Sequence, residues 1–415
     1  MKKLCAMAVL LSAAIQAQAV CEVSDVTLEQ GARSRLATVT YTLSGDGASI
    51  VTLQICTNAE TGACLKETDF SVSGELGRKI VSSVAGERHS ATVTFSKALK
   101  KGGLPAGASA IVKAWAPDDP PPVLVIDPKG TAENVRFYAA TNDFAGFRDR
   151  CYKDSLIALV RVPAKGGCVL GSPETQNHRG ADESQHHVTF TEDFYIGVYP
   201  VTVAQYAGWM GSAPRAWSGL EDFDIFPVFG VSYDMLRGTS VDWPETGHAV
   251  SEESALGILR NRTGIAFDLP TEAQWEFAAR AGAETANWNG SNDDAHVREI
   301  GYSYSSAHEV KNQYGRDRYP WAVGALLASP FGLHDVIGNC FEWCLDRYGA
   351  YSALPSVDPA GPASGSTRVC RGGYFGCDYY DCTSSRRTER DPSNGGNDGD
   401  YADAFGFRLA CPASF

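Results

Sequence analysis

Two cysteines near the end of the chain, Cys377 and Cys382, have a spacing at which sulfur chemistry is possible. They stand five positions apart, after Gly372-Gly373 and before a run of arginines. A fully extended chain would separate their Cα atoms by roughly 17 Å, whereas a disulfide needs roughly 7 Å or less. For the thiols to meet, residues 376–381 must turn back on themselves, and Gly376 followed by two aspartates suits such a turn.

Thiols that meet in this way can do three kinds of chemistry. They can form a structural disulfide, cycle as a redox pair, or bind a soft metal ion. Positive charge nearby favours thiolates over thiols, and three arginines follow the pair: Arg386, Arg387 and Arg390. The residues alone leave the three chemistries open, together with disulfides to other cysteines of the C-terminal part: Cys340, Cys344, Cys370 and Cys411.

Composition and the first residues limit the compartment and the partners. The formal net charge of −13 argues against nucleic acid or an anionic membrane surface, which both reward clustered Lys and Arg. Residues 1–19 predict a signal peptide, with Lys2-Lys3, a short apolar core and Ala17-Gln18-Ala19 as cleavage site. No later stretch is apolar enough to span a membrane. We expect an exported protein, periplasmic or secreted, in which most cysteines form disulfides.

The elements before residue 151 predict a domain without catalytic residues. Residues 20–128 contain segments that alternate apolar and polar side chains, separated by Gly, Asn and Asp, which is typical of an immunoglobulin-like sandwich. Cys56 and Cys64 are expected to staple a hairpin of this all-β domain. Residues 129–150 are expected to be a linker.

Residues 151–415 predict a loop-rich α+β domain that positions the cysteine pair. Its clearest helix spans 269–280, opened by a capping box of Thr271 and Gln274 and ended by Gly282. Thr202-Val-Ala-Gln205 opens a shorter helix in the same way. The sequence also allows a disulfide between Cys151 and Cys168. Around His178, His186 and His187 it predicts a surface loop, because the spacing of these histidines does not match a metal site.

Four blocks of this domain resemble the formylglycine-generating enzyme family, also called sulfatase-modifying factors. They include Leu-Pro-Thr-Glu-Ala-x-Trp-Glu and a Gly-Asn-x-x-Glu-Trp segment, and they are Val201–Tyr206, Leu269–Glu276, Gly332–Trp343 and Arg371–Arg408. The resemblance covers about residues 156–410 and implies a divergent relative of the C-type lectin fold. The expected fold class is therefore multidomain, with an N-terminal all-β sandwich and a C-terminal formylglycine-generating-enzyme-like domain.

The resemblance also implies an activity, its cofactor and its partner. The family oxidises a cysteine in a Cys-x-Pro-x-Arg segment of an unfolded sulfatase to formylglycine with dioxygen. In copper-dependent members the first ligand cysteine stands four residues after Gly-Gly and the second five residues later. Here these positions hold Cys377 and Cys382, which implies Cu(I) as cofactor and a sulfatase or other cysteine-containing peptide as partner. The implied substrate-binding residues are Arg386, Arg390 and Phe341.

A calcium site is implied as well, formed by the side chains of Asp335 and Glu342 and the carbonyls of Gly338 and Cys340. The chain departs from the oxidase pattern at two positions beside the cysteines: Tyr374 stands where serine is usual, and Phe341 where tryptophan is usual. The extra cysteines depart from it too. The alternative function is therefore a non-catalytic, exported ligand-binding module of lectin-like fold with structural disulfides.

Overall fold

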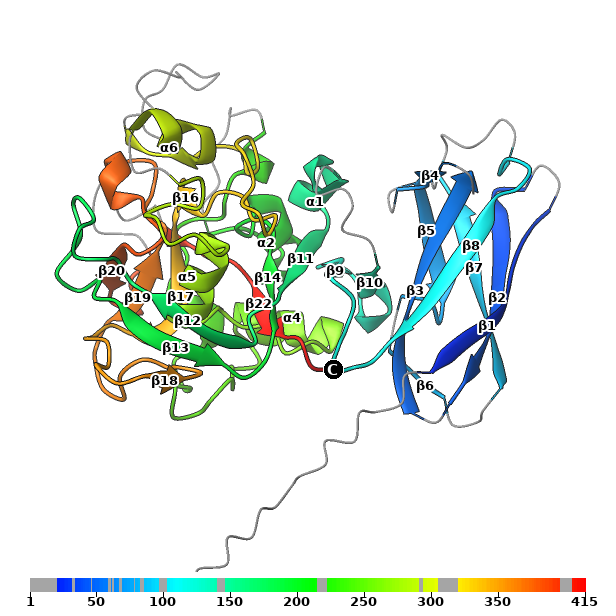
Figure 1. Ribbon diagram of the computed structural model, residues 1–415, viewed down its shortest axis with the longest axis horizontal. Coiled ribbons are helices and arrows are strands. Elements are labelled where there is room, and N and C mark those ends of the chain that lie inside the picture. Colours follow the sequence, from blue (N-terminus) through cyan, green and yellow to red (C-terminus); the bar gives the residue numbers. More distant parts are fainter. Residues whose placement is uncertain are drawn as a thin grey trace, which may run out of the picture.

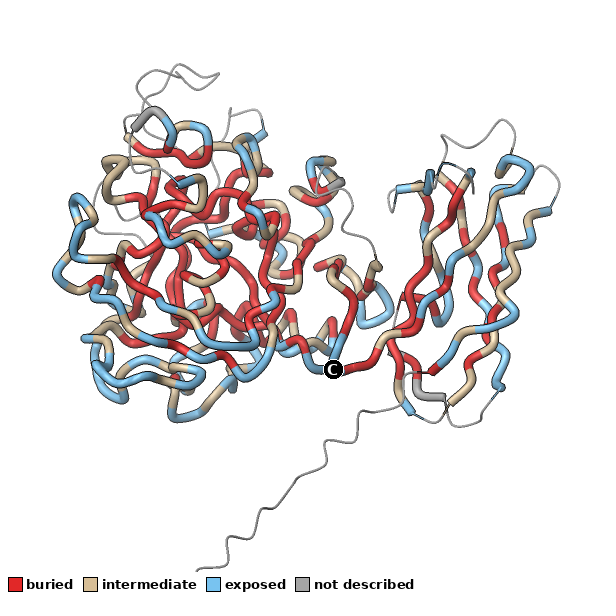
Figure 2. Tube along the Cα trace, in the orientation of Figure 1, coloured by how far each residue is buried: buried red, intermediate tan, exposed pale blue. Residues whose placement is uncertain are grey.

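A computed structural model of the chain shows an N-terminal β-rich region beside a larger C-terminal region (Figure 1). It describes residues 21–415 except for 32–33, 46, 59–60, 62, 67–68, 78, 83–85, 97–102, 140–145, 215–221, 291–293, 305–319 and 396–404. The predicted signal peptide, residues 1–19, lies outside the described residues. Buried residues fill the interior of both regions, and exposed residues gather on the loops around them (Figure 2).

Two antiparallel sheets make up the N-terminal region. The first has the order β1-β2-β7-β5, and in the second β3 pairs with β4, β6 and β8. Their bounds are β1 Glu22–Gln30, β2 Leu36–Ser44, β3 Gly47–Asn58, β4 Ala63–Cys64, β5 Phe70–Gly74, β6 Lys79–Ser82, β7 Glu87–Phe95 and β8 Ser109–Trp115. Buried side chains from both sheets, such as Tyr41, Ile55 and Val93, form one hydrophobic core. The β-rich character is as predicted, while the immunoglobulin topology stays a prediction.

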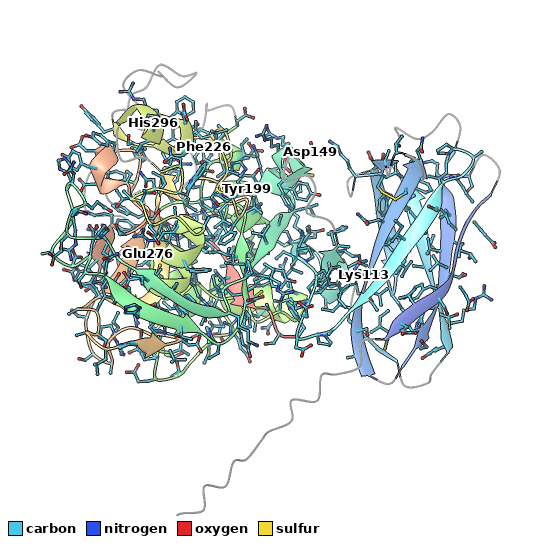
Figure 3. All side chains as sticks on the ribbon, in the orientation of Figure 1. Lys113, Asp149, Tyr199, Phe226, Glu276 and His296 are labelled. Carbon is cyan, nitrogen blue, oxygen red and sulfur yellow. A yellow bond between two sulfur atoms is a disulfide. The ribbon has the colours of Figure 1, made fainter. Side chains whose placement is uncertain are left out.

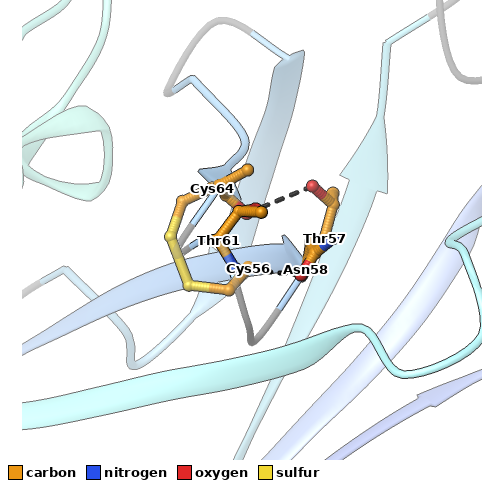
Figure 4. Close-up of a disulfide and its surroundings, with 6 residues drawn as sticks. Cys56, Thr57, Asn58, Thr61 and Cys64 are labelled. Carbon is orange, nitrogen blue, oxygen red and sulfur yellow. Dashed lines mark hydrogen bonds between the residues drawn. A yellow bond between two sulfur atoms is a disulfide. The ribbon is translucent and has the colours of Figure 1, made fainter.

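The predicted staple between Cys56 and Cys64 is confirmed, because these residues form a disulfide across β3 and β4 (Figure 4). The hydroxyl of Thr57 donates to the carbonyl of Ala63 at 3.1 Å, which ties the same hairpin a second time. The side-chain oxygen of Asn58 accepts from the turn amide of Thr61 at 3.1 Å. The hairpin is therefore closed covalently at its base and by hydrogen bonds along its turn.

The expectation that most cysteines form disulfides is wrong for the described residues, in which nine cysteines remain thiols. Cys151 and Cys168, for which the sequence allowed a disulfide, are among them. Cys151 opens a short helix beside acidic residues, whereas Cys168 lies on a strand that faces Glu276 and Arg280. Flanking two strands in sequence does not bring two cysteines together when each faces different neighbours.

Four sheets organise the C-terminal region, and the largest has the order β10-β9-β11-β14-β22. The others are β12-β13-β18, β20-β19-β17-β21 and the pair β15-β16. Their bounds are β9 Val123–Ile126, β10 Arg136–Tyr138, β11 Ile157–Val162, β12 Gly166–Leu170, β13 His186–Phe190, β14 Phe194–Gly197, β15 Gly301–Tyr302, β16 Ile337–Gly338, β17 Phe341–Arg347, β18 Ser356–Val357, β19 Arg368–Arg371, β20 Arg387–Arg390, β21 Phe405–Gly406 and β22 Ala410–Pro412.

Strands β9 and β10 fall within residues that the sequence assigned to the first domain and to the linker. β9 pairs with β11 from Val123–Val160 to Ile126–Ile157, and β10 pairs with β9. All four residues of β9 are buried, because the strand lies inside the largest sheet. An apolar run of four residues indicates a buried strand but not which sheet it joins.

Six α-helices lie in the C-terminal region among the described residues: α1 Cys151–Asp154, α2 Val203–Met210, α3 Tyr233–Arg237, α4 Ala255–Thr263, α5 Glu272–Arg280 and α6 Asp294–Ile300. The capping boxes predicted for α2 and α5 are both confirmed, since Thr202 with Gln205 and Thr271 with Gln274 bond reciprocally. Helix α5 ends at Arg280, and its C-cap is Ala281 in a left-handed conformation, one residue before Gly282, which the sequence predicted to end the helix. No described helix combines the length and the apolar character needed to cross a bilayer.

A buried ion-pair cluster joins α5 to the sheet that carries the cysteine loop. The carboxylate of Glu276 on α5, labelled in Figure 3, is 1% exposed and contacts Arg371 at the end of β19. It also accepts from Arg280 Nε and from the Gly171 amide, each at 2.7 Å. Burial opposes the charge, but Arg371, Arg280 and the Gly171 hydrogen bond overcome this and lower the pKa of Glu276 to about 2.

Two more pairs of the same kind lock neighbouring strands. Arg408 donates to both oxygens of Glu342 on β17, at 2.8 and 2.9 Å. Arg387 on β20 donates to both oxygens of Glu272 on α5, at 2.6 and 2.9 Å. A buried bidentate pair is costly to break, because the remaining charge has no partner. The pairs of Arg371 and Arg387 therefore fix β19 and β20 against α5, and the pair of Arg408 fixes the segment between β21 and β22 against β17.

The Glu276 cluster predicts a pH-dependent stability. The folded pKa lies below the unfolded value of 4.5, so its contribution is present above pH 4.5 and is lost as the pH falls toward 2. We expect Glu276→Gln to lower the free energy of unfolding by about 3 kcal/mol at pH 7 and to flatten its decrease below pH 4.5. Urea unfolding from pH 2 to 7 measures this, with the exposed Glu284→Gln as control. Equal curves for Glu276→Gln and the wild type would contradict it.

Candidate functional site

A glycine hinge starts the loop that carries the two cysteines. β19 ends at Arg371, and Gly372 and Gly373 both have positive φ, +90° and +75°. A Cβ on Gly373 would lie 2.7 Å from the Sγ atom of Cys382, and a Cβ on Gly372 would lie 3.2 Å from the Trp275 ring. Both positions therefore need glycine, for conformation and for space. The hinge lets the loop fold back over its own start.

The two thiols meet, as the turn predicted from sequence requires. Residues Tyr379–Asp381 form a turn of 3-10 helix, and the amide of Cys382 donates to the carbonyl of Tyr379 at 3.1 Å. The side chains of Cys377 and Cys382 are hydrogen-bonded to each other, and neither forms a disulfide. Cys382 is fully buried, whereas Cys377 is half-buried. Reagents and ligands from solvent therefore reach the pair through Cys377.

The carbonyl of Tyr374 holds both cysteines. It accepts from the Cys377 amide at 3.0 Å and from the Cys382 thiol at 3.8 Å. The carbonyl of Cys377 in turn accepts from the Tyr304 amide at 2.7 Å. The position of the two sulfur atoms thus depends on the backbone at residue 374.

An aromatic stack fixes that backbone. The Tyr374 ring stacks on Phe341 with centroids 5.1 Å apart, and Phe341 stacks on Phe405 at the same distance. Phe375 meets Tyr374 edge-on, also at 5.1 Å. A Cβ on Gly376 would lie 2.6 Å from the Tyr374 ring, so the ring covers the loop at this point. The two departures from the oxidase pattern, Tyr374 and Phe341, therefore contact each other and form one wall.

The prediction that nearby arginines favour thiolates is wrong for Cys382. Its pKa is raised well above the ordinary value, by the hydrogen bond with Cys377, by burial and by the charge of Asp381. Arg386 pairs with Asp381 at 2.9 Å, and Arg387 is taken up by Glu272. Arg386 and Arg387 are near the two cysteines in sequence, but each guanidinium group forms an ion pair with a carboxylate.

The other predicted substrate-binding residues lie around the same loop with unequal access. The guanidinium of Arg390 lies 5.1 Å from the Phe405 ring centroid. Phe341 is 8% exposed and covered by its stacking partners. Arg386 has a third of its side chain exposed, and Arg390 is also partly exposed. Both arginines can therefore be reached from solvent, whereas Phe341 is covered.

The two side chains predicted to bind calcium, Asp335 and Glu342, are not equally able to bind a cation. Asp335 is buried, accepts from the Gly324 amide at 2.7 Å through Oδ2, and leaves its buried Oδ1 without a partner. Burial raises the pKa of Asp335 to about 6 despite that hydrogen bond. Both oxygens of Glu342 already accept from Arg408, and one also accepts from Trp275 at 2.7 Å. Asp335 thus fits a cation, while Glu342 would have to share its oxygens with Arg408.

Asn339 is a positioning residue that the sequence did not single out. Its carbonyl accepts from the Phe375 amide at 3.2 Å, and its own amide donates to the Tyr302 carbonyl at 3.0 Å. Its side chain bonds to the backbone of Trp321. The positive φ of +66° and the position after Gly338 are signals of a turn that could have identified it. Asn339 thus fastens the cysteine loop to the segment beside it.

The predicted histidine loop carries no metal cluster in the part of the chain that is described. His178 stacks on Tyr380 of the cysteine loop with centroids 4.6 Å apart, and His186 stacks on Tyr351 at 3.9 Å. These rings therefore pack against aromatic side chains instead of converging on one point.

Fold and site together define a mixed α+β protein that presents two adjacent thiols on a glycine-hinged loop. Residues 150–413 match the family model described as sulfatase-modifying factor enzyme 1-like domain. The chain belongs to this family, which confirms the resemblance found in the sequence.

Known relatives carry two kinds of name. The chain is 35% identical to a formylglycine-generating enzyme of Thermomonospora curvata over 133 residues, covering 29% of this chain and 43% of that protein. It is 29% identical to the serine/threonine-protein kinase pkn1 of Chlamydia caviae over 254 residues, covering 59% and 37%. The match to mouse formylglycine-generating enzyme is 23% over 291 residues, covering 62% and 75%. The chain thus spans less than half the length of the first two relatives.

Among solved structures, PvdO from Pseudomonas aeruginosa aligns with a TM-score of 0.48 and 23% identity, covering 61% of this chain and 94% of that one.

The Tyr374 stack predicts how well Cys382 is protected. We expect Tyr374→Ala to destabilise the fold by about 3 kcal/mol, because it removes a buried ring, and to speed alkylation of Cys382 by iodoacetamide. Tyr374→Phe keeps the ring and should leave Cys382 slow to react. Mass spectrometry of the loop peptide at increasing times measures the rate. Equal rates in the alanine variant and the wild type would contradict the holding role of Tyr374.

Asp335 predicts a calcium-dependent stability. Its folded pKa lies above the unfolded 3.8, so the stability it gives is present below pH 3.8 and lost as pH rises through about 6. Without calcium at pH 8, Asp335→Asn should therefore be more stable than the wild type, by at most about 3 kcal/mol. Calcium should raise the Tm of the wild type and of the exposed-site control Asp358→Asn, but not of Asp335→Asn. An equal shift in all three would refute this site.

Proposed function

We propose that this protein is a formylglycine-generating oxidase, which oxidises a cysteine of a peptide to formylglycine with dioxygen. The observation that carries the proposal is the pair of adjacent thiols, Cys377 and Cys382, which form no disulfide, in a chain that belongs to the family. The substrate we propose is a Cys-x-Pro-x-Arg segment of an unfolded sulfatase, or another cysteine-containing peptide.

Copper is the proposed cofactor, and the donor set suits it. Two sulfur ligands select the soft Cu(I) ion over harder and commoner cations. Cys377 and Cys382 would hold the ion, which supplies activation of dioxygen at the substrate sulfur. Because burial and hydrogen bonding favour the protonated thiol of Cys382, binding of the ion must release protons. Copper affinity should therefore rise with pH.

The electron balance of the reaction requires a second reductant. Converting the substrate CH2–SH group to an aldehyde releases the sulfur as hydrogen sulfide and gives up two electrons. Reduction of dioxygen to two water molecules takes four electrons, one water being offset by the oxygen that enters the aldehyde through hydration. The remaining two electrons must come from an external pair of thiols, which is oxidised to a disulfide. The buried position of Cys382 argues that this reductant is a small molecule.

The chain's own residues would bind and orient the peptide. Half-buried Cys377 would leave an approach for the substrate thiol, and the carbonyl of Tyr374 accepts from the Cys377 amide and from the Cys382 thiol. Arg386, which lies between Asp381 and solvent, is the proposed contact for the peptide backbone or an acidic side chain. Arg390 and Phe341 are proposed to shape the wall behind it. Calcium at Asp335 is proposed to hold the neighbouring turn.

The export signal and the role of the first region complete the proposal. We propose that residues 1–19 direct the chain out of the cytoplasm, and that residues 20–128 act as a spacer in front of the catalytic domain 151–415. In this setting the client would be a sulfatase that is modified before it folds.

A non-catalytic ligand-binding module is the second candidate. It is favoured by the raised pKa of the Cys382 thiol, which opposes the thiolate that copper binding needs. The two candidates differ in copper stoichiometry, since only the oxidase requires one Cu(I) per thiol pair.

Activity on a peptide tests the proposal. Incubation of the copper-loaded protein with a Cys-x-Pro-x-Arg peptide, dioxygen and a thiol should lower the peptide mass by the thiol-to-aldehyde difference. Cys377→Ser and Cys382→Ser should each reduce the rate by at least about 100-fold and abolish 1:1 copper binding. Cys411→Ser, a buried cysteine on β22, serves as matched control. Bound copper without any mass change would leave the family assignment intact and reject the oxidase.

A further inference from the structure

A pocket beside α5 contains a buried carboxyl group that the proposed oxidase does not use. Its volume is about 310 Å³, and neither Cys377 nor Cys382 lines it. Residues of α5, of strands β12 and β18 and of the loop 349–362 line it. Figure 1 shows β12, β18 and this loop on the lower side of the C-terminal region. This volume suits a ligand of fragment size.

Two of the three carboxylates on the pocket wall are neutralised within the protein. Glu276 contacts Arg371 and Arg280. Glu272 accepts twice from Arg387 and once from the hydroxyl of Tyr351, at 2.9 Å. A ligand gains little by approaching either of them.

Asp346, on β17, is the third carboxyl and has no cation at ion-pair distance among the described residues. Its side chain is 3% exposed, and Oδ2 accepts from the Glu272 amide at the start of α5, at 2.7 Å. Oδ1 faces Gly361, on which a Cβ would lie 3.1 Å away. Burial, then the charge of Glu272, raises the pKa of Asp346 to about 7, against hydrogen bonds from the backbone amides of Glu272 and Asp346 and the charge of Arg387. The group therefore lacks a positive partner.

The rest of the wall suits an apolar body. Leu170, Ala273 and Pro362 line the pocket, and the exposed residues Ala350 and Ser352 form its rim. Gly361 has a φ of +76°, and a Cβ there would lie 2.8 Å from the Cβ of Asp346. Glycine at this position lets the loop close over Asp346 without filling the space beside it.

We propose that this pocket binds a small primary amine with an apolar body, whose ammonium group pairs with Oδ1 of Asp346. The ammonium would supply the missing countercharge, and the apolar side would lie against the aliphatic wall. This site is independent of the proposed oxidase activity.

An anionic ligand does not fit the same pocket. Arg387 and His186 are the basic residues on its wall, and His186 stacks on Tyr351. All three guanidinium nitrogens of Arg387 already donate: Nε and Nη2 to Glu272, and Nη1 to the carbonyls of Gly349 and Asp182. A neutral alcohol could donate to Asp346 but would leave its charge unbalanced. Positive charge is therefore the property that should decide affinity.

Benzylamine tests the proposal, with benzyl alcohol as its neutral match. In saturation-transfer NMR on the full chain at pH 8, we expect benzylamine to bind with a Kd of about 1 mM, as suits a ligand of this size. Benzyl alcohol should bind at least about tenfold more weakly, because it lacks the charge. Asp346→Asn, which can still accept from the Glu272 amide, should weaken benzylamine by a similar factor.

Two further variants protect the result against misfolding and surface binding. Ala350→Phe should block the rim and abolish binding while the charge of Asp346 stays. Asp358→Asn removes an exposed carboxylate of the same loop and should leave binding unchanged. The proposal is overturned if benzyl alcohol binds as tightly as benzylamine, if Ala350→Phe or a folded Asp346→Asn binds like the wild type, if Asp358→Asn abolishes binding, or if no transfer occurs at about 10 mM.

Discussion

The position of the two thiols depends on the buried ion pair between Arg371 and Glu276, at the start of the cysteine loop. Arg371 is the last residue of β19, and Gly372-Gly373 follow it directly. Both charges are removed from water, so each needs the other to offset its desolvation. This requirement fixes β19 against α5 and therefore fixes where the cysteine loop begins. The glycine hinge then turns the chain, and the Tyr374 carbonyl sets the distance between the sulfurs.

Burial of the cysteine pair favours the neutral thiol and disfavours the charged thiolate. Fully enclosed Cys382 is favoured as a neutral thiol, which protects it from oxidants but opposes thiolate formation. The proposed Cu(I) ion would reverse this balance, because its bond to sulfur would replace the proton. Half-buried Cys377 is the approach that such an ion would use. Under the proposed function, the same enclosure would make the metal affinity depend on proton release.

Local sequence signals predicted the local structure well, and long-range pairing was beyond them. The capping boxes at Thr202 and Thr271 and the Cys56–Cys64 hairpin depend on residues within eight positions. The failure at the arginines has the opposite cause: Arg387 pairs with Glu272, 115 positions away. A run of positive charge next to two thiols indicates an electropositive site only when no remote carboxylate takes up the charge. Sequence order does not contain that information.

Helix α5 borders both the start of the cysteine loop and the pocket that contains Asp346. Glu276 faces Arg371 and hence the cysteine loop, while the amide of Glu272 donates to Asp346 in the pocket. Arg371 Nε also lies 3.8 Å from the carboxylate of Glu272, so one guanidinium faces both acids of the helix. In a buried network, a positive charge placed beside Asp346 is only partly screened. Glu272 and Glu276 thus border both the pocket and Arg371, the residue that starts the cysteine loop.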